Sequence, residues 1–201
     1  MTLPAIRVEP LSPTRRGDFL RFFDHERGPA FSDNPEWARC YCHYYHVPKI
    51  LPWKTFTADQ NRTAMTARIE TGEQDGFLAY VGDEVVGWLN AAPWHKLPHA
   101  CDRVGAARPP LDVPEHAAAA ILCFVIAPAW RRRGVARALL AGALASFAAR
   151  GIRVVDAFPF KAGADPTPAD LYHGPAELFA AAGFEVHGET DDVTVMRRRL
   201  A

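Results

Sequence analysis

An apolar run over residues 117–130 leads directly into an arginine-rich turn and then into a stretch rich in alanine and leucine. The run reads AAAAILCFVIAPAW and is followed by RRRGVARALL. It is shorter than the roughly 20 residues that cross a bilayer and contains a proline, so it predicts a buried central strand. The stretch after it predicts a helix over about 133–150. This succession indicates a chain of mixed α and β structure.

Three arginines, Arg131, Arg132 and Arg133, stand where a helix N-terminus ordinarily favours acidic side chains. The positive end of the helix and its unpaired N–H groups stabilise anions at that place. Arginines there point to an anionic ligand, and the alternative is a basic helix start on a solvated surface. Gly134 and the small residue Ala136 let the backbone approach a ligand closely, so the turn is a candidate cradle for a pyrophosphate.

The composition fits one globular domain over residues 1–201. The chain is 49% hydrophobic, with 23 basic and 23 acidic side chains. Zero net charge argues against broad nucleic-acid binding, which draws its affinity from phosphate neutralisation. The four cysteines follow no secretory or membrane-spanning segment, so we expect reduced thiols and a cytoplasmic protein. The sequence leaves open whether the protein forms a homodimer.

The remaining patterns predict the order of elements along the chain. Before the apolar run they are a strand over 5–11, a helix over 12–26 capped by Ser12, an aromatic arm over 28–52, a helix over 57–71, a hairpin over 75–94 with Gly82 and Asp83 in its turn, and a surface loop over 95–114. After the helix that follows this run they are a strand over 152–160, a short helix over 174–184 and a closing strand pair.

This order, together with the basic turn, resembles the GCN5-related N-acetyltransferase (GNAT) superfamily. The family signature Q/R-x-x-G-x-G/A after a strand is matched by Arg131, Gly134 and Ala136, and the later ELFAAAGFEV resembles the family's helix-to-strand element. The resemblance implies an α/β (α+β) fold with a mixed, mostly antiparallel central sheet flanked by helices. It also implies a splayed pair of central strands.

The resemblance implies acetyl-coenzyme A as cosubstrate and no metal. Its pantetheine arm would pair with the strand backbone, and a backbone N–H there would stabilise the oxyanion. Its pyrophosphate would lie in the basic turn. The residues so implied are Phe124, Val125, Ile126, Arg131, Arg132, Arg133, Gly134, Val135, Ala136 and Arg137.

The proton donor is the point at which the chain departs from the family pattern. Phe179 stands where the family often has a tyrosine acid, so Tyr172 and His173 are the nearest replacements. Tyr172 could equally pack the loop, His173 could be exposed to solvent, and an enzyme without a dedicated acid stays open. Cys123 raises the further alternative of an acyl-cysteine route, although direct transfer to an amine is the family norm.

Asp156 lies in a run, DAFPF, that resembles an E-A-Y-P run found in a subset of the family. It is a candidate to hold a substrate ammonium or to act through water as a base, and the alternative is a turn acid at a strand end.

The arm EWARCYCHYYHVP admits three interpretations. Cys40, Cys42, His43 and His46 are zinc-ligand types, but C-x-C-H-x-x-H is too compressed for the usual geometry. We favour an aromatic lid over the acceptor, with pure packing as the other alternative. The substrate-binding candidates are Trp37 and Tyr44 from the arm and Trp94 beyond it.

Two classes of function are compatible with these features. One is an N-acetyltransferase that moves an acetyl group to a primary amine of a small molecule, with peptide N-termini, polyamines, aminoglycosides and amino acids as open acceptors. The other is a non-catalytic acyl-coenzyme A sensor that keeps the fold without the acid.

Overall fold

The computed structural model describes residues 5–24, 28–161 and 171–201, which form one mixed sheet of seven strands in the order β1-β2-β3-β4-β5-β7-β6. Only the neighbours β4 and β5 run parallel. The strands are β1 (Ile6–Pro10), β2 (Phe77–Val81), β3 (Glu84–Pro93), β4 (Ala118–Ile126), β5 (Val154–Ala157), β6 (Glu185–Glu189) and β7 (Thr194–Arg199). The expected mixed, mostly antiparallel sheet is confirmed.

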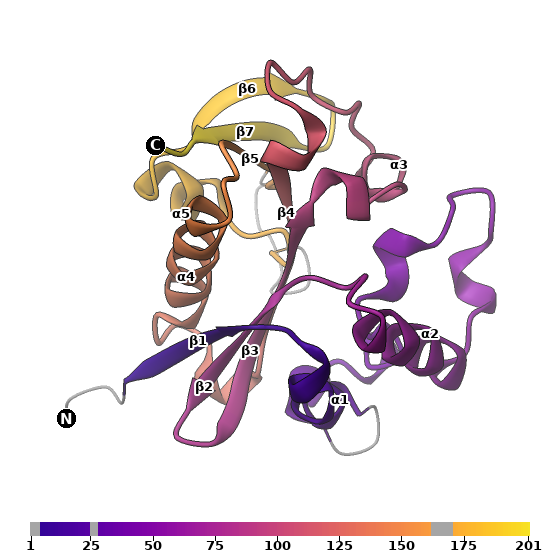
Figure 1. Ribbon diagram of the computed structural model, residues 1–201. Coiled ribbons are helices and arrows are strands. Elements are labelled where there is room, and N and C mark those ends of the chain that lie inside the picture. The colour runs from indigo at the N-terminus through magenta and orange to yellow at the C-terminus, as the bar shows by residue number, and fades with distance from the viewer. Residues whose placement is uncertain (1–4, 25–27, 162–170) are drawn as a thin grey trace.

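Helices cover both sides of this sheet (Figure 1). The described helices are α1 (Arg16–Phe23), α2 (Ala58–Glu70), α3 (Ala100–Val104), α4 (Val135–Ala149) and α5 (Ala176–Ala181). Figure 1 shows α4 and α5 on one side and α1 and α2 on the other. We call these the α4 face and the arm face.

Regular helix packing forms the α4 face. The helix α4 buries an aliphatic stripe and Phe147, which meets Phe77 of β2 edge to face at 5.6 Å between ring centroids. Gly142 lets the helix lie close to β1, because a Cβ at this position would come within 2.7 Å of the Val8 side chain. This face therefore has the tight, uniform packing of an ordinary core.

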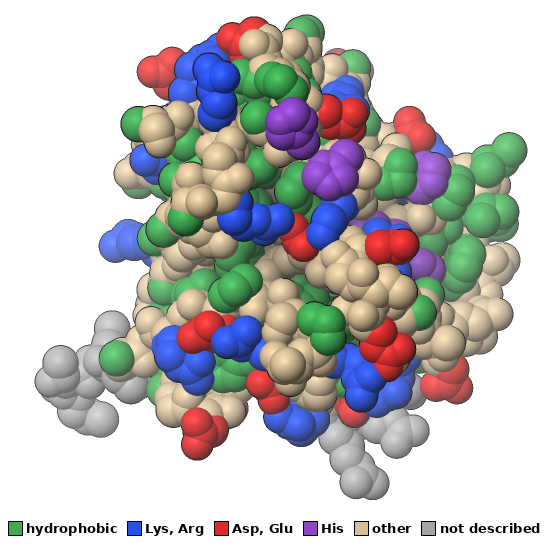
Figure 2. Space-filling model, viewed as in Figure 1, with side chains coloured by type: hydrophobic (Ala, Val, Ile, Leu, Met, Phe, Trp, Pro, Cys, Tyr) green, Lys and Arg blue, Asp and Glu red, His purple; other side chains and the backbone are tan. Residues whose placement is uncertain are grey.

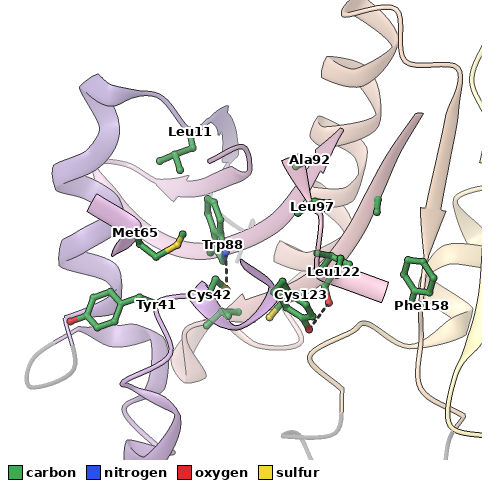
Figure 3. Packing of buried hydrophobic residues seen from close by; sticks show 14 of the residues in the cluster. Leu11, Tyr41, Cys42, Met65, Trp88, Ala92, Leu97, Leu122, Cys123 and Phe158 are labelled. Atoms are coloured by element: carbon green, nitrogen blue, oxygen red, sulfur yellow. Dashed lines mark hydrogen bonds between the residues drawn. The ribbon is translucent and has the colours of Figure 1, made fainter. Parts of the chain in front are cut away.

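Short turns and aromatic rings form the arm face. The arm contains the 3-10 turns Pro29–Phe31, Pro35–Trp37 and His43–His46, and the core beneath it includes Trp88 of β3 and Phe23 of α1. Figure 3 shows Trp88, Cys42 and Cys123 gathered beneath the arm. The absence of helical or strand period in the sequence reflects this succession of short turns.

Local signals in the sequence placed most elements correctly. Thr57 and Gln60 form a reciprocal capping box at the start of α2, and Gly82 has the positive φ that the β2–β3 turn requires. Two expectations were wrong. Ser12 makes no capping hydrogen bond, because its hydroxyl pairs with Thr14 at 2.8 Å and a 3-10 turn precedes α1. The expected surface loop over 95–114 contains α3, which buries two apolar side chains.

The strands β4 and β5 separate after a short parallel stretch, which bears out the expected splay. They pair only from Ala118 with Val154 to Ile121 with Ala157. Beyond that point β4 stays paired with β3 as far as Ile126. The chain after β5 instead follows β7, since Thr194 N–H donates to the Pro159 carbonyl at 2.9 Å. The inner edge of β4 from residue 122 onward is therefore free of a strand partner on the β5 side.

Candidate active site

The basic turn joins the end of β4 to the start of α4. Gly134 occupies the N-cap position with φ +85°, and no side chain caps the helix. The first hydrogen bond into the helix comes from Ala138 N–H to the Gly134 carbonyl at 3.0 Å, so the N–H groups of residues 135–137 precede the helical ladder. Glycine is needed here because of the left-handed backbone, and nothing crowds its α-carbon.

The arginines of this turn divide into two kinds. Arg131 is half-buried and faces the arm, donating to the Ile126 carbonyl at 3.2 Å and to both carboxylate oxygens of Asp33 at 2.5 and 3.1 Å. The exposed arginines are Arg132, Arg133 and Arg137. Arg131 therefore ties the turn to the arm, and the exposed three are the ones free to meet an anion from solvent. Sequence reasoning had not singled out Asp33, since no local pattern links it to Arg131.

A tyrosine–histidine pair bridges the two walls of the splay. The Tyr45 hydroxyl lies 2.8 Å from His173 Nε2 and 3.2 Å from the Leu122 carbonyl on β4. His173 Nδ1 lies 2.7 Å from the Phe158 carbonyl, on the chain leaving β5. Because a carbonyl only accepts, Nδ1 carries the proton, and Nε2 of the neutral ring is an acceptor. The single Tyr45 hydroxyl proton therefore faces two acceptors, Nε2 and the Leu122 carbonyl, and the contact to Nε2 is the shorter. Tyr45 and His173 thus link the Leu122 carbonyl of β4 to the Phe158 carbonyl after β5.

The protonation state of His173 follows from its burial. The side chain is 2% exposed, and this desolvation lowers its pKa to about 4, although the hydrogen bond to Phe158 raises it slightly. The imidazole is therefore neutral near pH 7 and engaged at both nitrogens. The alternative of a solvent-exposed histidine is excluded.

Tyr172 contributes its backbone and its ring to the same place. Its carbonyl accepts the Phe124 N–H at 2.6 Å, and its ring meets Trp37 edge to face at 5.1 Å between centroids. Burial raises the pKa of the phenol above its usual value, and the nearby Cys123 raises it further. Tyr172 thus combines a protonated phenol with contact to the arm. Val125 and Ile126 keep their pairing with Trp88 and Gly87 of β3.

Phe179 lies in the core of the α4 face rather than in the splay. It is fully buried and contacts Phe124 and Phe184, with ring centroids 6.1 and 5.3 Å away. An aromatic ring without a hydroxyl in this position supplies packing and no proton.

Asp156 is fully buried in an ion pair. Arg197 of β7 donates to its two oxygens at 2.7 and 3.0 Å, and Trp94 Nε1 donates to Oδ2 at 3.1 Å. Arg197 also donates to the Pro110 carbonyl at 2.7 Å. The structure therefore brings together two predicted site residues, Asp156 and Trp94, in a closed cluster that fastens the segment before β4 to the sheet. No spacing in the sequence linked Arg197 to this cluster.

The cysteines and histidines of the arm diverge from one another. Cys42 accepts from Trp88 Nε1 at 3.2 Å and lies against Cys123 (Figure 3). His43 instead stacks on His46, with ring centroids 6.5 Å apart, and its Nδ1 lies 2.8 Å from Asn61 Oδ1. Burial raises the pKa of both Cys40, to about 12, and Cys42. Within the described residues, no three His, Cys, Asp or Glu side chains are grouped to hold a metal ion.

The remaining arm candidates sit at the rim of the same face. The Tyr44 ring is covered by the Arg103 guanidinium at 4.8 Å, and Trp37 is half-buried against Tyr172. Figure 2 shows basic and acidic side chains interspersed over the visible surface.

None of the helices in the described parts of the chain has the length and apolar character needed to span a membrane.

Comparison with protein families decides the membership of the chain. The model of the acetyltransferase (GNAT) family matches residues 36–166, which include the splay, the basic turn and α4. The chain belongs to the GNAT family of acetyltransferases. It is accordingly an N-acetyltransferase by family, and acetyl-coenzyme A is the cosubstrate of such enzymes. No curated protein matched the sequence.

Solved structures show the same fold at low sequence identity. The GNAT domain of a Streptomyces lividans protein named PAT has a TM-score of 0.57 at 20% identity, over 97% of this chain and 90% of that one. A GCN5-related N-acetyltransferase from Kribbella flavida has a TM-score of 0.55 at 20% identity, over 98% of both chains. A putative acetyltransferase from Salmonella typhimurium, solved with acetyl-CoA, has a TM-score of 0.53 at 16% identity, over 98% and 95%.

Proposed function

We propose that this GNAT protein acetylates a primary amine of a small molecule by direct transfer from acetyl-coenzyme A. The observation that carries the proposal is the uncapped N-terminus of α4 directly after a splayed β4. In this proposal the neutral amine nitrogen forms the new C–N bond and loses a proton to water, the C–S bond breaks, and the departing thiolate takes a proton from the donor. The acetyl group itself arrives as the thioester of the cosubstrate.

The cosubstrate-binding roles follow from the two features of β4 and α4. The N–H groups of Val135, Ala136 and Arg137 point along the helix dipole toward an anion, and Gly134 leaves them uncovered. We assign phosphate contacts to the exposed Arg132, Arg133 and Arg137, with Arg131 holding the turn. Phe124, Val125 and Ile126 line the splay, where the Phe124 N–H would bind the thioester carbonyl in place of the Tyr172 carbonyl that it now meets at 2.6 Å.

We assign the proton donor to Tyr172. Its phenol stays protonated at neutral pH because burial raises its pKa, and it lies near Cys123 on β4 beside the proposed thioester position. His173 is neutral and engaged at both nitrogens, so we give it a positioning role through Tyr45. Asp156 is likewise a positioning residue, because Arg197 and Trp94 occupy both its oxygens.

The acceptor would enter beneath the arm. Trp37 reaches Tyr172 directly, and Tyr44 stands beside the buried Tyr45, with ring centroids 5.2 Å apart. Trp94 donates to Asp156 and packs against Phe158, whose carbonyl meets His173. We therefore propose that the arm acts as the acceptor wall, in keeping with its aromatic sequence.

A second candidate function is acyl-coenzyme A sensing without turnover. It is favoured by one contact, the Tyr172 carbonyl on the Phe124 N–H at 2.6 Å, which places a protein carbonyl where the thioester would bind. The buried Phe179 in place of the family tyrosine agrees with it. Under this alternative, bound acyl-coenzyme A displaces the Tyr172 carbonyl from the Phe124 N–H, and the movement of the segment that carries Tyr172 is the signal.

Release of free thiol from acetyl-coenzyme A separates the two candidates. The panel comprises amino acids, polyamines, aminoglycosides and peptides with free N-termini, with Gly134→Val as the matched protein control. Amine-dependent thiol release in the native protein and none in the variant supports acetyl transfer. Saturable acetyl-coenzyme A binding with no thiol release from any amine would favour sensing.

A further inference from the structure

Four polar side chains gather on the arm face between the end of α2, the strand β3 and the arm. We call His46, Arg68, Gln74 and Asn90 the polar cluster. Gln74 and Asn90 are 3% and 0% exposed. Gln74 Nε2 donates to the Asp75 carbonyl at 2.6 Å and only distantly, at 3.4 Å, to Asn90 Oδ1. The Gln74 side chain also lies close enough to the His46 ring to raise its pKa slightly against the effect of burial, but the contact does not reach hydrogen-bond geometry at either ring nitrogen.

The polar cluster holds every buried side-chain nitrogen or oxygen that lacks a hydrogen-bond partner in residues 5–24, 28–161 and 171–201. These atoms are Asn90 Nδ2, Gln74 Oε1, Arg68 Nε and both ring nitrogens of His46. Native proteins pair nearly all such atoms, because leaving one buried and unpaired destabilises the fold. Their concentration in one place, while the rest of the described chain is satisfied, indicates a site built for a polar ligand.

The polar cluster adjoins the proposed acetyl-binding position. Asn90 pairs with Cys123 in the β3–β4 register, and Cys123 directly precedes Phe124. Asn90 lies on β3 between Trp88 and Ala92, two residues of the arm-face core. His46 directly follows Tyr45, whose hydroxyl reaches the Leu122 carbonyl in the splay. A ligand held by the polar cluster would thus sit one strand away from the Phe124 N–H.

The unpaired atoms specify the chemistry of that ligand. Arg68 Nε and Asn90 Nδ2 are N–H donors, and one of them belongs to a cation. Gln74 Oε1 is an acceptor. Burial, with the charge of Arg68 beside it, lowers the pKa of His46 to about 3, so the imidazole is neutral at pH 7. None of the unpaired atoms belongs to a carboxylate, since Glu73 pairs with Arg68 Nη1 at 3.3 Å and Asp75 with Lys96 and Arg150.

We propose that the polar cluster binds the carboxylate of an α-amino acid, and that the acceptor of this enzyme is therefore an amino acid rather than a polyamine. Arg68 and Asn90 donate to the carboxylate oxygens, and Gln74 accepts from the remaining polar group of the ligand. The role of the amino acid as acetyl acceptor rests on the proposed acetyl transfer. The binding itself does not depend on turnover.

Melting temperatures measured with paired ligands test the binding, because a ligand that binds only the folded state raises the melting temperature. Each L-amino acid is compared with the amine left by removing its carboxylate, for example leucine with isopentylamine and histidine with histamine, with and without coenzyme A. We expect at least one amino acid to raise the melting temperature and its paired amine not to. Equal responses to both members of every pair, or no response to any, would overturn the proposal.

Two variants assign the binding to these atoms. Arg68→Met and Asn90→Leu should each weaken the binding of the amino acid that raised the melting temperature, by at least tenfold. Arg62→Met serves as the control on the same helix, since Arg62 is paired with Asp24 outside the polar cluster at 2.9 Å. Full retention of binding in Arg68→Met would place the site elsewhere. Arg68 is partly exposed, so this variant carries the test even if Asn90→Leu does not fold.

The stability of the same variants separates a ligand site from a structural one. Asn90 has only the 3.4 Å contact to lose, so Asn90→Leu should hold or raise the melting temperature of the free protein. Asn61 pairs with Arg39 at 2.9 Å and His43 at 2.8 Å, so Asn61→Leu should lower it. A large loss of stability in Asn90→Leu, with no amino-acid response in the native protein, would mean a structural role.

Thiol release distinguishes the failure of this inference from the failure of the proposed function. Thiol release with polyamines alone would keep the acetyltransferase and overturn the amino-acid acceptor. Amino-acid binding without thiol release from any amine would keep the site and overturn the transfer.

Discussion

The α4 face and the arm face of the sheet are built on different principles. On the α4 face one long helix packs aliphatic side chains and Phe147 against β1, β2, β3 and β4, and Gly142 permits close contact. On the arm face short turns bring tyrosines, cysteines and histidines over β3 and β4, and every buried unpaired side-chain atom of the described residues lies there. Both faces bury a hydrophobic core, but only the arm face includes unpaired polar atoms, which lower the stability locally.

Truncation of the α4-face core should have the largest effect on folding. Phe147→Ala removes a fully buried ring that packs on Phe77, and should lower the free energy of unfolding by about 3–5 kcal/mol. The measurement is urea denaturation, with Tyr45→Phe on the arm face as the comparison. Tyr45→Phe loses only a hydroxyl and should cost about 1–3 kcal/mol. A larger effect at Tyr45 would reverse the assignment of the two faces.

Acid should act mainly through the arm face. Burial lowers the pKa of His173 in the folded protein to about 4, below the usual value of 6.5, so the unfolded chain binds more protons between these values. The free energy of unfolding should therefore fall as the pH drops from about 6.5 to about 4, by up to about 3 kcal/mol. Above pH 6.5 this residue should have no effect on it. Denaturation of His173→Asn across that range should give a shallower slope. Part of the pH dependence should remain in this variant, because the pKa of His46 is also lowered.

The proton donor can be tested by removing one oxygen. Tyr172→Phe keeps the ring that packs on Trp37 and should reduce kcat on the order of 10²-fold, with little change in acetyl-coenzyme A affinity. His173→Asn should reduce kcat less, because His173 acts through Tyr45. If the order of these two effects is reversed, His173 is the donor. If neither variant loses turnover, water or the substrate carries the proton.

The basic turn can be tested at its glycine. Gly134→Val places a β-branched residue at φ +85° and should weaken acetyl-coenzyme A binding at least about tenfold, because the turn must change shape. Gly134→Asn is the matched variant, since asparagine tolerates the left-handed region, and it should retain more binding. Calorimetric titration measures both. Equal binding by the two variants would mean that this backbone shape is not needed for the cosubstrate.

The smallest expected effect concerns the rim of the arm. Trp37→Ala removes an edge-to-face contact with Tyr172, a contact type that contributes about 0.5–1.5 kcal/mol, so the KM of the acceptor should rise by roughly two- to tenfold. Affinity for acetyl-coenzyme A should not change. A loss confined to cosubstrate binding would contradict the assignment of the arm to the acceptor.

Sequence reasoning predicted the features whose cause is local. The helix start at Thr57, the hairpin turn at Gly82 and the glycine of the basic turn each depend on a few neighbouring residues, and the structure has all three. It could not predict pairs that the fold brings together from distant positions. Tyr45 with His173, and Asp156 with Arg197, carry no spacing that links them. The polar cluster escaped notice for the same reason, since its four residues come from the arm, α2, the following turn and β3.

The bridge across the splay also bears on the order in which the molecule assembles. Tyr45 and His173 are 128 positions apart in the chain, and Tyr45 and Leu122 are 77 apart. The β2–β3 hairpin closes a far shorter loop, and contacts between distant positions form more slowly because their loops are harder to close. We expect a refolding chain to regain its far-ultraviolet circular dichroism before it regains amine-dependent thiol release. The part of the enzyme that meets the acceptor would then be the last part to exist.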